Sequence, residues 1–439
     1  MADKLIFILP GITLLLFFAN IFFRGNNVQS CMLFVLAFLP LMDLKVTKEA
    51  WGGFKTFDII CLYCLIFLLK EFIMVNLNTH NNFYFFLFLV IVIILLIGGL
   101  ASEFPAKTYF NVIRMLPIFI FGRFLLTEFY KDDRFYIKAI NALKISYVVA
   151  LSVLFIQTIV GLRFTFYPVL GPNTIDPVFH TVRYPGVFFD SQASGQFLAM
   201  GSFLFLFLEK DTTKKMAMLN YLVFALAIAG ILLAGSRAAL AGFGLGLVLV
   251  IMIGSGQYRV YGITIITIGA IAYLVLSPKS GIFERASRIN DDYSYRASIW
   301  RDALNIAKKH PMLGIGWNNY QNYIMRHDQD QYLELENQEL LYFTQPENGY
   351  LKILVELGYI GFAAFALYLV VPVVKGLIYF FTNLYDRRVV LLIAVLLSWM
   401  VPFYSVYSIT DYRLLIMVTC MIVLIVAYPQ KDYNESASA

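Results

Sequence analysis

Residues 83–100 read FYFFLFLVIVIILLIGGL, a run of eighteen residues without a charge. A helix needs about 20 mostly apolar residues to cross the hydrocarbon core of a bilayer. The composition of the whole chain agrees with this run: of 439 residues, 60 % are apolar and 14 % are charged, and the mean hydropathy is +0.73. Soluble domains average ~45–50 % apolar and ~25 % charged residues. The sequence therefore predicts a polytopic membrane protein and excludes a soluble globule, a disordered chain and a disulfide scaffold.

Apolar runs recur along the whole chain, and they predict an all-α fold with about twelve transmembrane helices, twelve or thirteen by count of the runs. The run at 29–44 is short and contains Pro40 and Asp43, which favours a re-entrant segment. The run at 109–129 contains Pro117 and two arginines, which favours a broken helix. The topology of the N-terminal half is therefore left open. The runs lie at 5–23, 29–44, 57–75, 83–100, 109–129, 140–162, 192–209, 217–234, 236–253, 259–277, 357–380, 389–404 and 413–428.

Short basic loops orient the C-terminal half of the chain. By the positive-inside rule, the side that these loops share is cytoplasmic. The long hydrophilic stretch 278–346 then faces outward, and its balanced charge is compatible with that side because the rule applies to short loops. We expect an N-terminal transmembrane bundle at 1–277, a large outer loop at 278–346, and C-terminal helices with a short cytoplasmic tail at 347–439. The orienting residues are Lys131, Arg134, Lys138, Lys210, Lys214, Lys215, Arg387 and Arg388.

The outer loop contains a predicted amphipathic helix at 293–309, with Ile299 among its apolar positions. The His-Pro step at 310–311 ends this helix, and Gly314 and Gly316 mark a turn after it. A loop of this length between spans is usually functional.

Four arginines adjoin the predicted outer ends of the spans. Arg183 precedes one apolar run, Arg237 begins another, and Arg296 and Arg301 lie on the loop helix. Arginine near a membrane core usually points to a partner or a functional site, and its planar fork matches phosphate geometry bidentately. Arginines that converge on one outer face would form a diphosphate clamp. The alternative is that they snorkel to the interface or pair with loop carboxylates.

A carboxylate precedes the span that follows the long loop. Pro346 cannot continue a preceding helix, and Asn348 is a good N-cap for the next one, so Glu347 is expected at a helix start that faces the outer water. A carboxylate in this place can act as the general base for a sugar hydroxyl if its pKa suits. The alternative is a carboxylate that only stabilises the helix terminus.

No sequence motif indicates a cofactor, a metal or a nucleic acid. The four cysteines all lie in apolar stretches, and the Cys61-x-x-Cys64 pair is read as packed helix residues. The chain contains no P-loop, no glycine-rich dinucleotide turn and no metal-spaced cluster of histidines and cysteines. The net charge of +6 is modest and is spread over short clusters, without a basic tract that alternates with aromatic residues.

Four blocks of the sequence resemble the O-antigen ligase/polymerase superfamily, and they occur in the order and spacing of that family. The resemblance covers roughly residues 180–365. It implies a multi-pass enzyme of the bacterial inner membrane with about twelve spans and one large periplasmic loop, similar to GT-C glycosyltransferases. Such enzymes move glycan from undecaprenyl diphosphate to an acceptor hydroxyl, invert the anomeric centre and need no metal. The four blocks are 235–240, 296–300, 310–317 and 347–361.

The resemblance also implies roles for individual residues. Glu347 and Arg237 would be catalytic, and the active site would face the periplasm. Arg183 and Arg237 would hold the diphosphate, and Arg296, with Arg301 as a further candidate, would assist from the loop. The full set expected to bind diphosphate or glycan is Arg183, Arg237, Arg296, Arg301, Asn348 and Tyr350.

One departure from the family pattern separates its two branches. Ligases typically show His-Asn about ten residues before a Gly-x-x-Gly; here Gly358-x-x-Gly361 is present, but Glu347 stands in the histidine position. This favours an O-antigen polymerase, for which the partners would be undecaprenyl-diphosphate-linked oligosaccharide, the bilayer and, as a further candidate, a chain-length-regulating co-polymerase. A ligase acting on lipid A-core is the alternative. A lipid-linked-sugar transporter is more distant, because it is expected to show repeats and interrupted midplane helices.

Overall fold

The computed structural model describes residues 2–47, 53–73, 79–132, 134–167, 182–209, 212–253, 289–328, 345–383 and 388–428, with residues 332–334 and 340–342 and isolated positions between these ranges. The expected run at 259–277, the start of the outer loop and the C-terminal tail lie largely outside the described residues.

Helices form nearly all of the regular structure that is described, as the apolar runs predict. In the outer loop, strands β1 (Tyr332–Glu334) and β2 (Leu340–Tyr342) pair antiparallel. The helices are α1 (Ala2–Arg24), α2 (Val28–Ala37), η1 (Leu39–Leu41), α3 (Thr56–Phe67), α4 (Leu69–Ile73), α5 (Thr79–Ala101), α6 (Pro105–Ile113), α7 (Leu116–Lys131), α8 (Phe135–Val160), α9 (Ser191–Ser202), η3 (Phe203–Leu206), α10 (Lys214–Ala234), α11 (Arg237–Ile253), α14 (Ile289–Lys309), α15 (Tyr320–His327), α16 (Gly349–Thr382), α17 (Arg388–Phe403) and α18 (Tyr412–Ala427).

Within the described residues, four helical segments are long and apolar enough to cross a membrane: Pro105–Lys131, Phe135–Val160, Lys214–Ala234 and Gly349–Thr382. Seven further apolar helices have only 10–17 residues each. The architecture is therefore that of a helical, multi-pass membrane protein, while the count of twelve spans stays a prediction.

Two irregular segments match their sequence signals. The expected break in 109–129 falls between α6 and α7, where Arg114 and Met115 turn and Pro117 lies in the first turn of the new helix. α2 has ten residues, too few to cross a bilayer, and after η1 the chain turns back through a bridge between Lys45 and Lys55 to begin α3. This short helix and return are compatible with the expected re-entrant segment.

The run at 192–209 forms a short helix and a 3-10 turn instead of one continuous helix. α9 has twelve residues, eleven of them buried, and it gives way to the 3-10 turn η3. Small residues bring its neighbours too close for a lipid-facing helix: a Cβ on Gly195 would lie 2.6 Å from the Ser236 side chain, and one on Gly201 would lie 2.2 Å from the Tyr147 ring. α9 is therefore an inner element of the bundle.

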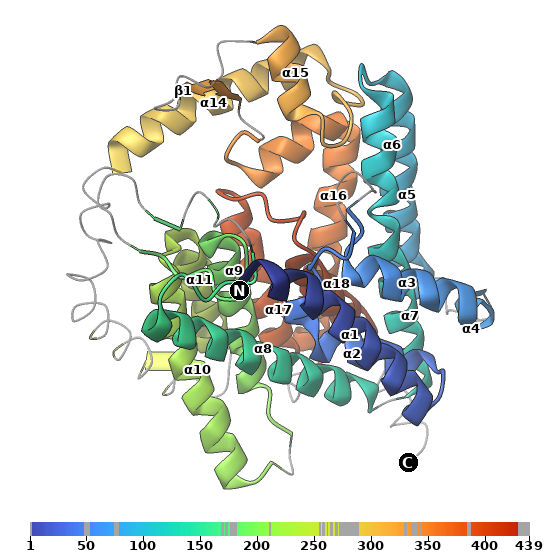
Figure 1. The fold of residues 1–439 in the computed structure, drawn as a ribbon, viewed down its shortest axis with the longest axis vertical. Coiled ribbons are helices and arrows are strands. Elements are labelled where there is room, and N and C mark those ends of the chain that lie inside the picture. The colour runs from blue at the N-terminus through green and yellow to red at the C-terminus, as the bar shows by residue number, and fades with distance from the viewer. Residues whose placement is uncertain are drawn as a thin grey trace.

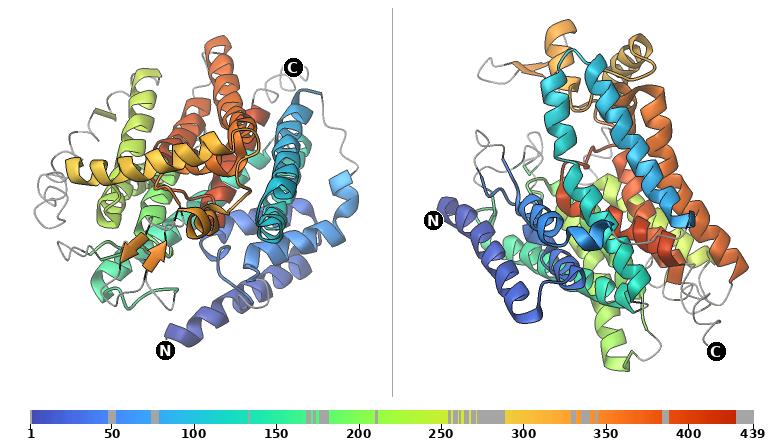
Figure 2. Two further views of the ribbon diagram at one scale, coloured as in Figure 1. Left: turned by 90° about the horizontal axis from the view of Figure 1, so that it is seen from above. Right: turned by 90° about the vertical axis from the view of Figure 1, so that its right-hand side faces the viewer.

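The predicted loop helix forms and begins slightly earlier, as α14. Its buried residues Ala303, Ile306 and Ala307 pack in one cluster with Leu351 and Val355 of α16, and Ile299 is buried as well. Figure 1 shows α14 and α15 at one end of the molecule above the start of α16, and in Figure 2 (left) α14 lies across the helices beneath it. The outer loop therefore forms a lid layer, here defined as α14, α15 and the turn 310–319.

A kink in α16 fastens the lid layer to the bundle. Gly358 has φ 67° and ψ −173° inside this helix, so the carbonyls of the preceding turn lack their usual partners. Ile315 N–H donates to the Val355 carbonyl at 3.1 Å, and Gly316 N–H donates to the Glu356 carbonyl at 3.0 Å. The kink at Gly358 thus frees carbonyl groups of α16, and these carbonyls accept hydrogen bonds from the lid layer.

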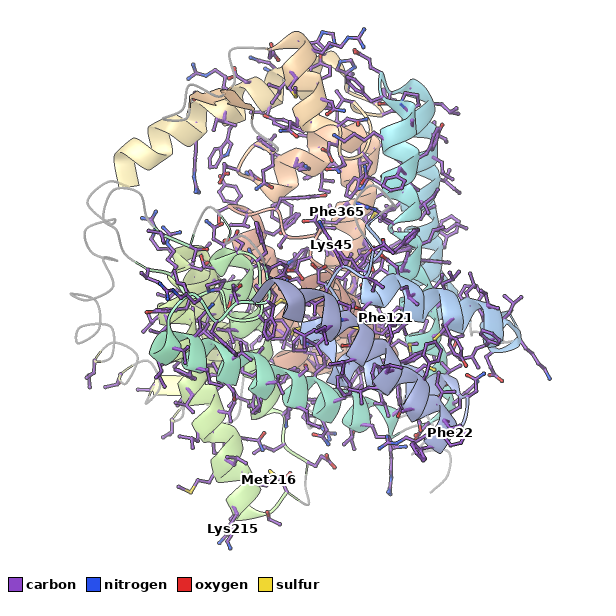
Figure 3. The ribbon with its side chains drawn as sticks, in the orientation of Figure 1. Phe22, Lys45, Phe121, Lys215, Met216 and Phe365 are labelled. Atoms are coloured by element: carbon purple, nitrogen blue, oxygen red, sulfur yellow. The ribbon has the colours of Figure 1, made fainter. Side chains whose placement is uncertain are left out.

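The lid layer and the basic turn before α10 lie at opposite ends of the molecule. Lys215 and Met216 mark the far end of α10 in Figure 3, away from α14 and α15. This arrangement agrees with the prediction that the basic turn and the long loop lie on different sides of the membrane. Which of the two sides is cytoplasmic stays a prediction.

Candidate functional site

Glu347 lies at the start of α16, as its position before an N-cap predicts. Asn348 is buried, and its side chain accepts the Leu351 N–H at 3.1 Å. Glu347 itself has φ 51°, in the left-handed region. Such a conformation costs a non-glycine residue ~1–3 kcal/mol and clusters at functional sites. The local backbone therefore holds the carboxylate in one direction at a cost in stability.

Arg296 of the lid layer approaches this carboxylate. Its Nη2 lies 3.7 Å from Glu347 Oε2, and each side chain is about one third exposed, at 33 % and 32 %. Arg296 lies on the buried face of α14, since it precedes Trp300 by four residues and Ala303 by seven. Packing of that face on α16 therefore brings the two charges together.

Burial and two neighbouring charged residues set the pKa of the Glu347 carboxyl. Burial raises the pKa of its carboxyl above the usual range, Arg296 lowers that pKa, and the Asp190 carboxylate raises it. The net direction is upward, because burial is the largest effect. A carboxylate with a raised pKa is a stronger base than an ordinary glutamate, which suits proton abstraction near neutral pH.

Arg183 and Arg237 both adjoin the turn between α10 and α11, here called the arginine turn. Gly235 ends α10 in the left-handed conformation, and a Cβ there would lie 3.0 Å from Arg183 Cγ. The adjoining Tyr184 N–H donates to the Leu233 carbonyl at 3.1 Å. Arg237 is exposed at the first position of α11. Two guanidinium groups at a helix N-terminus form a favourable place for an anion.

α9 connects the arginine turn to Glu347. Its N-cap Asp190 accepts the Gln192 N–H at 3.1 Å and is close enough to Glu347 to raise the pKa of that residue. Gly195, one turn further on, packs against Ser236 in the arginine turn. These contacts therefore connect Glu347 to Arg296 and to Asp190 at the start of α9, and connect α9 to the arginine turn.

Two predicted site residues have other surroundings. Arg301 is exposed, and it follows Arg296 by five residues, which places it about 140° further round α14. Tyr350 is half-buried: its hydroxyl donates to the Met400 carbonyl at 2.8 Å, and its ring lies 4.9 Å from that of Phe403. Tyr350 therefore ties α16 to α17.

Sequence reasoning missed Asp190 and Arg413. Arg413 is fully buried in α18 and pairs with Asp411 at 2.6 Å, with its guanidinium 4.0 Å from the centre of the Phe188 ring. Its Nη1 also donates to the Val187 carbonyl, so it anchors the segment that carries Arg183 and Asp190. The available signal was an acidic and a basic residue in D-x-R spacing at the start of the last apolar run.

Within the part of the chain that the structure describes, no group of three histidine, cysteine or acidic side chains is arranged to hold a metal ion. The four cysteines are buried and are not in disulfides. This fits their interpretation as packed helix residues.

Comparison with known proteins bears on the same region. Residues 222–366 match the family model described as O-antigen ligase. The match includes Arg237, Arg296 and Glu347, while Arg183 precedes it. A search of curated proteins finds no match.

Proposed function

We propose that this chain, a membrane glycosyltransferase that carries a domain of the O-antigen ligase family at residues 222–366, joins undecaprenyl-diphosphate-linked oligosaccharide repeats as an O-antigen polymerase. The observation that carries the proposal is the Glu347 carboxylate, held 3.7 Å from Arg296 with a raised pKa, in a cluster that includes the arginine turn. We place this cluster at the periplasmic face of the bacterial inner membrane.

The proposed reaction is a single displacement. Glu347 accepts the proton of the acceptor hydroxyl, and the acceptor oxygen attacks the anomeric carbon of the donor sugar. The bond from that carbon to the diphosphate oxygen breaks, and its electron pair stays on the diphosphate. Arg183 and Arg237 stabilise the charge that develops there, and attack from the opposite face inverts the anomeric centre.

Glu347 is the reason for preferring the polymerase. Ligases of the family typically carry a histidine at this position, and an imidazole and a carboxylate need different tuning to act as a base at the same pH. Here burial and Asp190 supply such tuning for a carboxylate. A ligase that transfers the finished polymer to lipid A-core is the second candidate, because its donor and its leaving group are the same.

The test is the lipopolysaccharide gel profile of a deletion strain with an intact core. Core with a single repeat in place of the ladder supports the polymerase. Bare core with accumulating lipid-linked polymer supports the ligase, and an unchanged ladder contradicts an O-antigen substrate. Transfer of repeats by the purified protein would exclude a transporter.

Complementation with variants then tests the base. Glu347→Gln is expected to restore no ladder, with transfer in vitro lowered ~10²–10⁴-fold, the usual contribution of a general base. The matched control is Glu71→Gln, which alters an exposed carboxylate paired with Lys131 and should restore the full ladder. A full ladder with Glu347→Gln would contradict the assignment.

A further inference from the structure

Two aromatic side chains meet beside Glu347 without belonging to the charged cluster. The Trp300 and Tyr404 rings lie 5.4 Å apart with their planes at 71°. Trp300 comes from α14 in the lid layer, and Tyr404 follows the end of α17. Tyr404 is 52 % exposed.

Two independent contacts place Tyr404 near the proposed base. Trp300 is one helical turn beyond Arg296, so its Cβ lies about 6 Å from the Cβ of the residue that pairs with Glu347. From the other side, a Cβ on Gly349 would lie 2.6 Å from the Phe403 carbonyl oxygen, so the backbones adjoining Glu347 and Tyr404 touch.

The backbone at Tyr404 is held in place. Its N–H donates to the Val401 carbonyl at 3.1 Å, and the next two N–H groups, of Ser405 and Val406, donate to the Pro402 carbonyl at 2.9 and 3.0 Å. The ring therefore projects from a closed helix end, which limits the entropy lost when a ligand covers it.

We propose that Trp300 and Tyr404 form a platform for the acceptor sugar, on which the apolar face of a pyranose ring packs. The proposal rests on the proposed function and names the subsite that function requires. A pyranose presents C–H groups on one face and hydroxyls at its rim, so a ring on Tyr404 directs rim hydroxyls toward Glu347. An aromatic ring suits this task because it offers a rigid, partly polar surface.

The platform differs in chemistry from the arginine turn. The arginines recognise the diphosphate of the donor, whereas the platform recognises a neutral sugar without a lipid or a phosphate. A donor and an acceptor that both carry lipid are thereby bound through different groups.

The test uses the oligosaccharide repeat released from its lipid carrier, added to the full-length protein in nanodiscs and observed by saturation-transfer NMR. The ring C–H protons of one sugar should receive saturation. Tyr404→Ala should weaken binding about tenfold, and Tyr404→Phe should stay within about twofold of the unsubstituted protein, because the ring and not the hydroxyl makes the surface. Thermal melting of each variant shows whether it is folded.

Tyr359→Ala is the matched control, since Tyr359 is 51 % exposed on α16 and its described hydrogen bond uses the backbone. Binding by Tyr404→Ala equal to that of the unsubstituted protein overturns the proposal, and so does equal loss in Tyr404→Phe. Sugar binding that depends on Tyr404, in a protein that transfers no repeat, would leave the platform standing and refute the polymerase.

Discussion

Arg296 Nη2 lies 3.7 Å from Glu347 Oε2, a separation that gives electrostatic attraction but is longer than the 2.7–2.9 Å of a strong charge-assisted hydrogen bond. At this distance the guanidinium stabilises the ionised carboxylate and leaves its oxygen able to accept a proton. Because Arg296 belongs to the lid layer and Glu347 directly precedes the N-cap of α16, docking of the lid layer on α16 also completes the site.

The pH profile of transfer should report on Glu347. The base works when it is deprotonated, so activity falls as the pH drops through its pKa, and a raised pKa places this fall at a higher pH than for an exposed glutamate. Arg296→Gln removes a group that lowers the pKa, so the acidic limb of kcat/KM should move to higher pH.

Asp190→Asn should move the same limb to lower pH, because Asp190 raises the pKa of Glu347. Asparagine caps a helix about as well as aspartate, so α9 should keep its N-cap. Shifts in the same direction for Arg296→Gln and Asp190→Asn would refute this account of the electrostatics.

Replacement of either clamp arginine by lysine should impair transfer despite conserving the charge. Arg183→Lys and Arg237→Lys each lose the planar fork that binds a diphosphate through two parallel hydrogen bonds. A loss of ~10–100-fold in kcat/KM for the lipid-linked donor is expected, given ~1.5–3 kcal/mol for a hydrogen bond to a charged group.

Arg301→Lys serves as the comparison for the clamp, because Arg301 is exposed on a different face of α14. Its kcat/KM should stay within about threefold of that of the unsubstituted protein, as is usual for surface substitutions. Equal kcat/KM values for all three lysine variants would contradict bidentate recognition of the diphosphate at the arginine turn.

Gly358→Ala should loosen the lid layer. A Cβ at this position would lie 2.4 Å from the Met312 carbonyl oxygen, and φ is +67°. We expect a loss of at least roughly 2 kcal/mol in the free energy of unfolding, with lower transfer activity, measured by thermal melting in detergent.

Gly244→Ala tests whether the loss is local. Gly244 is helical and has nothing within 4 Å of a Cβ, so alanine there should be neutral or should stabilise by up to ~1 kcal/mol. Equal melting temperatures for the two alanine variants would show that the kink at Gly358 is not needed for docking.

Lys352 and Glu356 form a buried ion pair at 3.4 Å within α16. The Glu356 carboxylate also accepts hydrogen bonds from the N–H groups of Asn318 and Tyr320, at 2.9 and 3.3 Å, and so joins α16 to the lid layer. Lys352→Met leaves a buried carboxylate without its partner and should cost roughly 3–5 kcal/mol.

Addition of Glu356→Gln to Lys352→Met should recover part of that stability, because glutamine keeps an acceptor oxygen and removes the charge. Melting temperatures of the two single variants and the double variant measure this coupling. A double variant that is less stable than both single variants would contradict it.

The local features were readable from the sequence because neighbouring residues decide them. Asn348 is an N-cap, the His-Pro step ends α14, and the helix at 109–129 breaks beside Pro117. Each follows from the hydrogen-bonding or steric properties of the residue itself. The position of Glu347 at a helix start followed from the same local patterns.

Only the tertiary structure decided which of these residues meet. Asp190 lies near Glu347, and Arg413 supports the segment that carries Asp190, through contacts with residues far away in the chain. Hydropathy also did not reveal that α9 is buried among other helices. Hydropathy reports how apolar a segment is, and it does not distinguish burial in lipid from burial against other helices. The sequence by itself determined a polytopic helical protein with charged groups near the ends of its spans. Which of these charges meet depended on long-range packing. Small residues such as Gly195, and the kink at Gly358, set how closely distant segments approach each other.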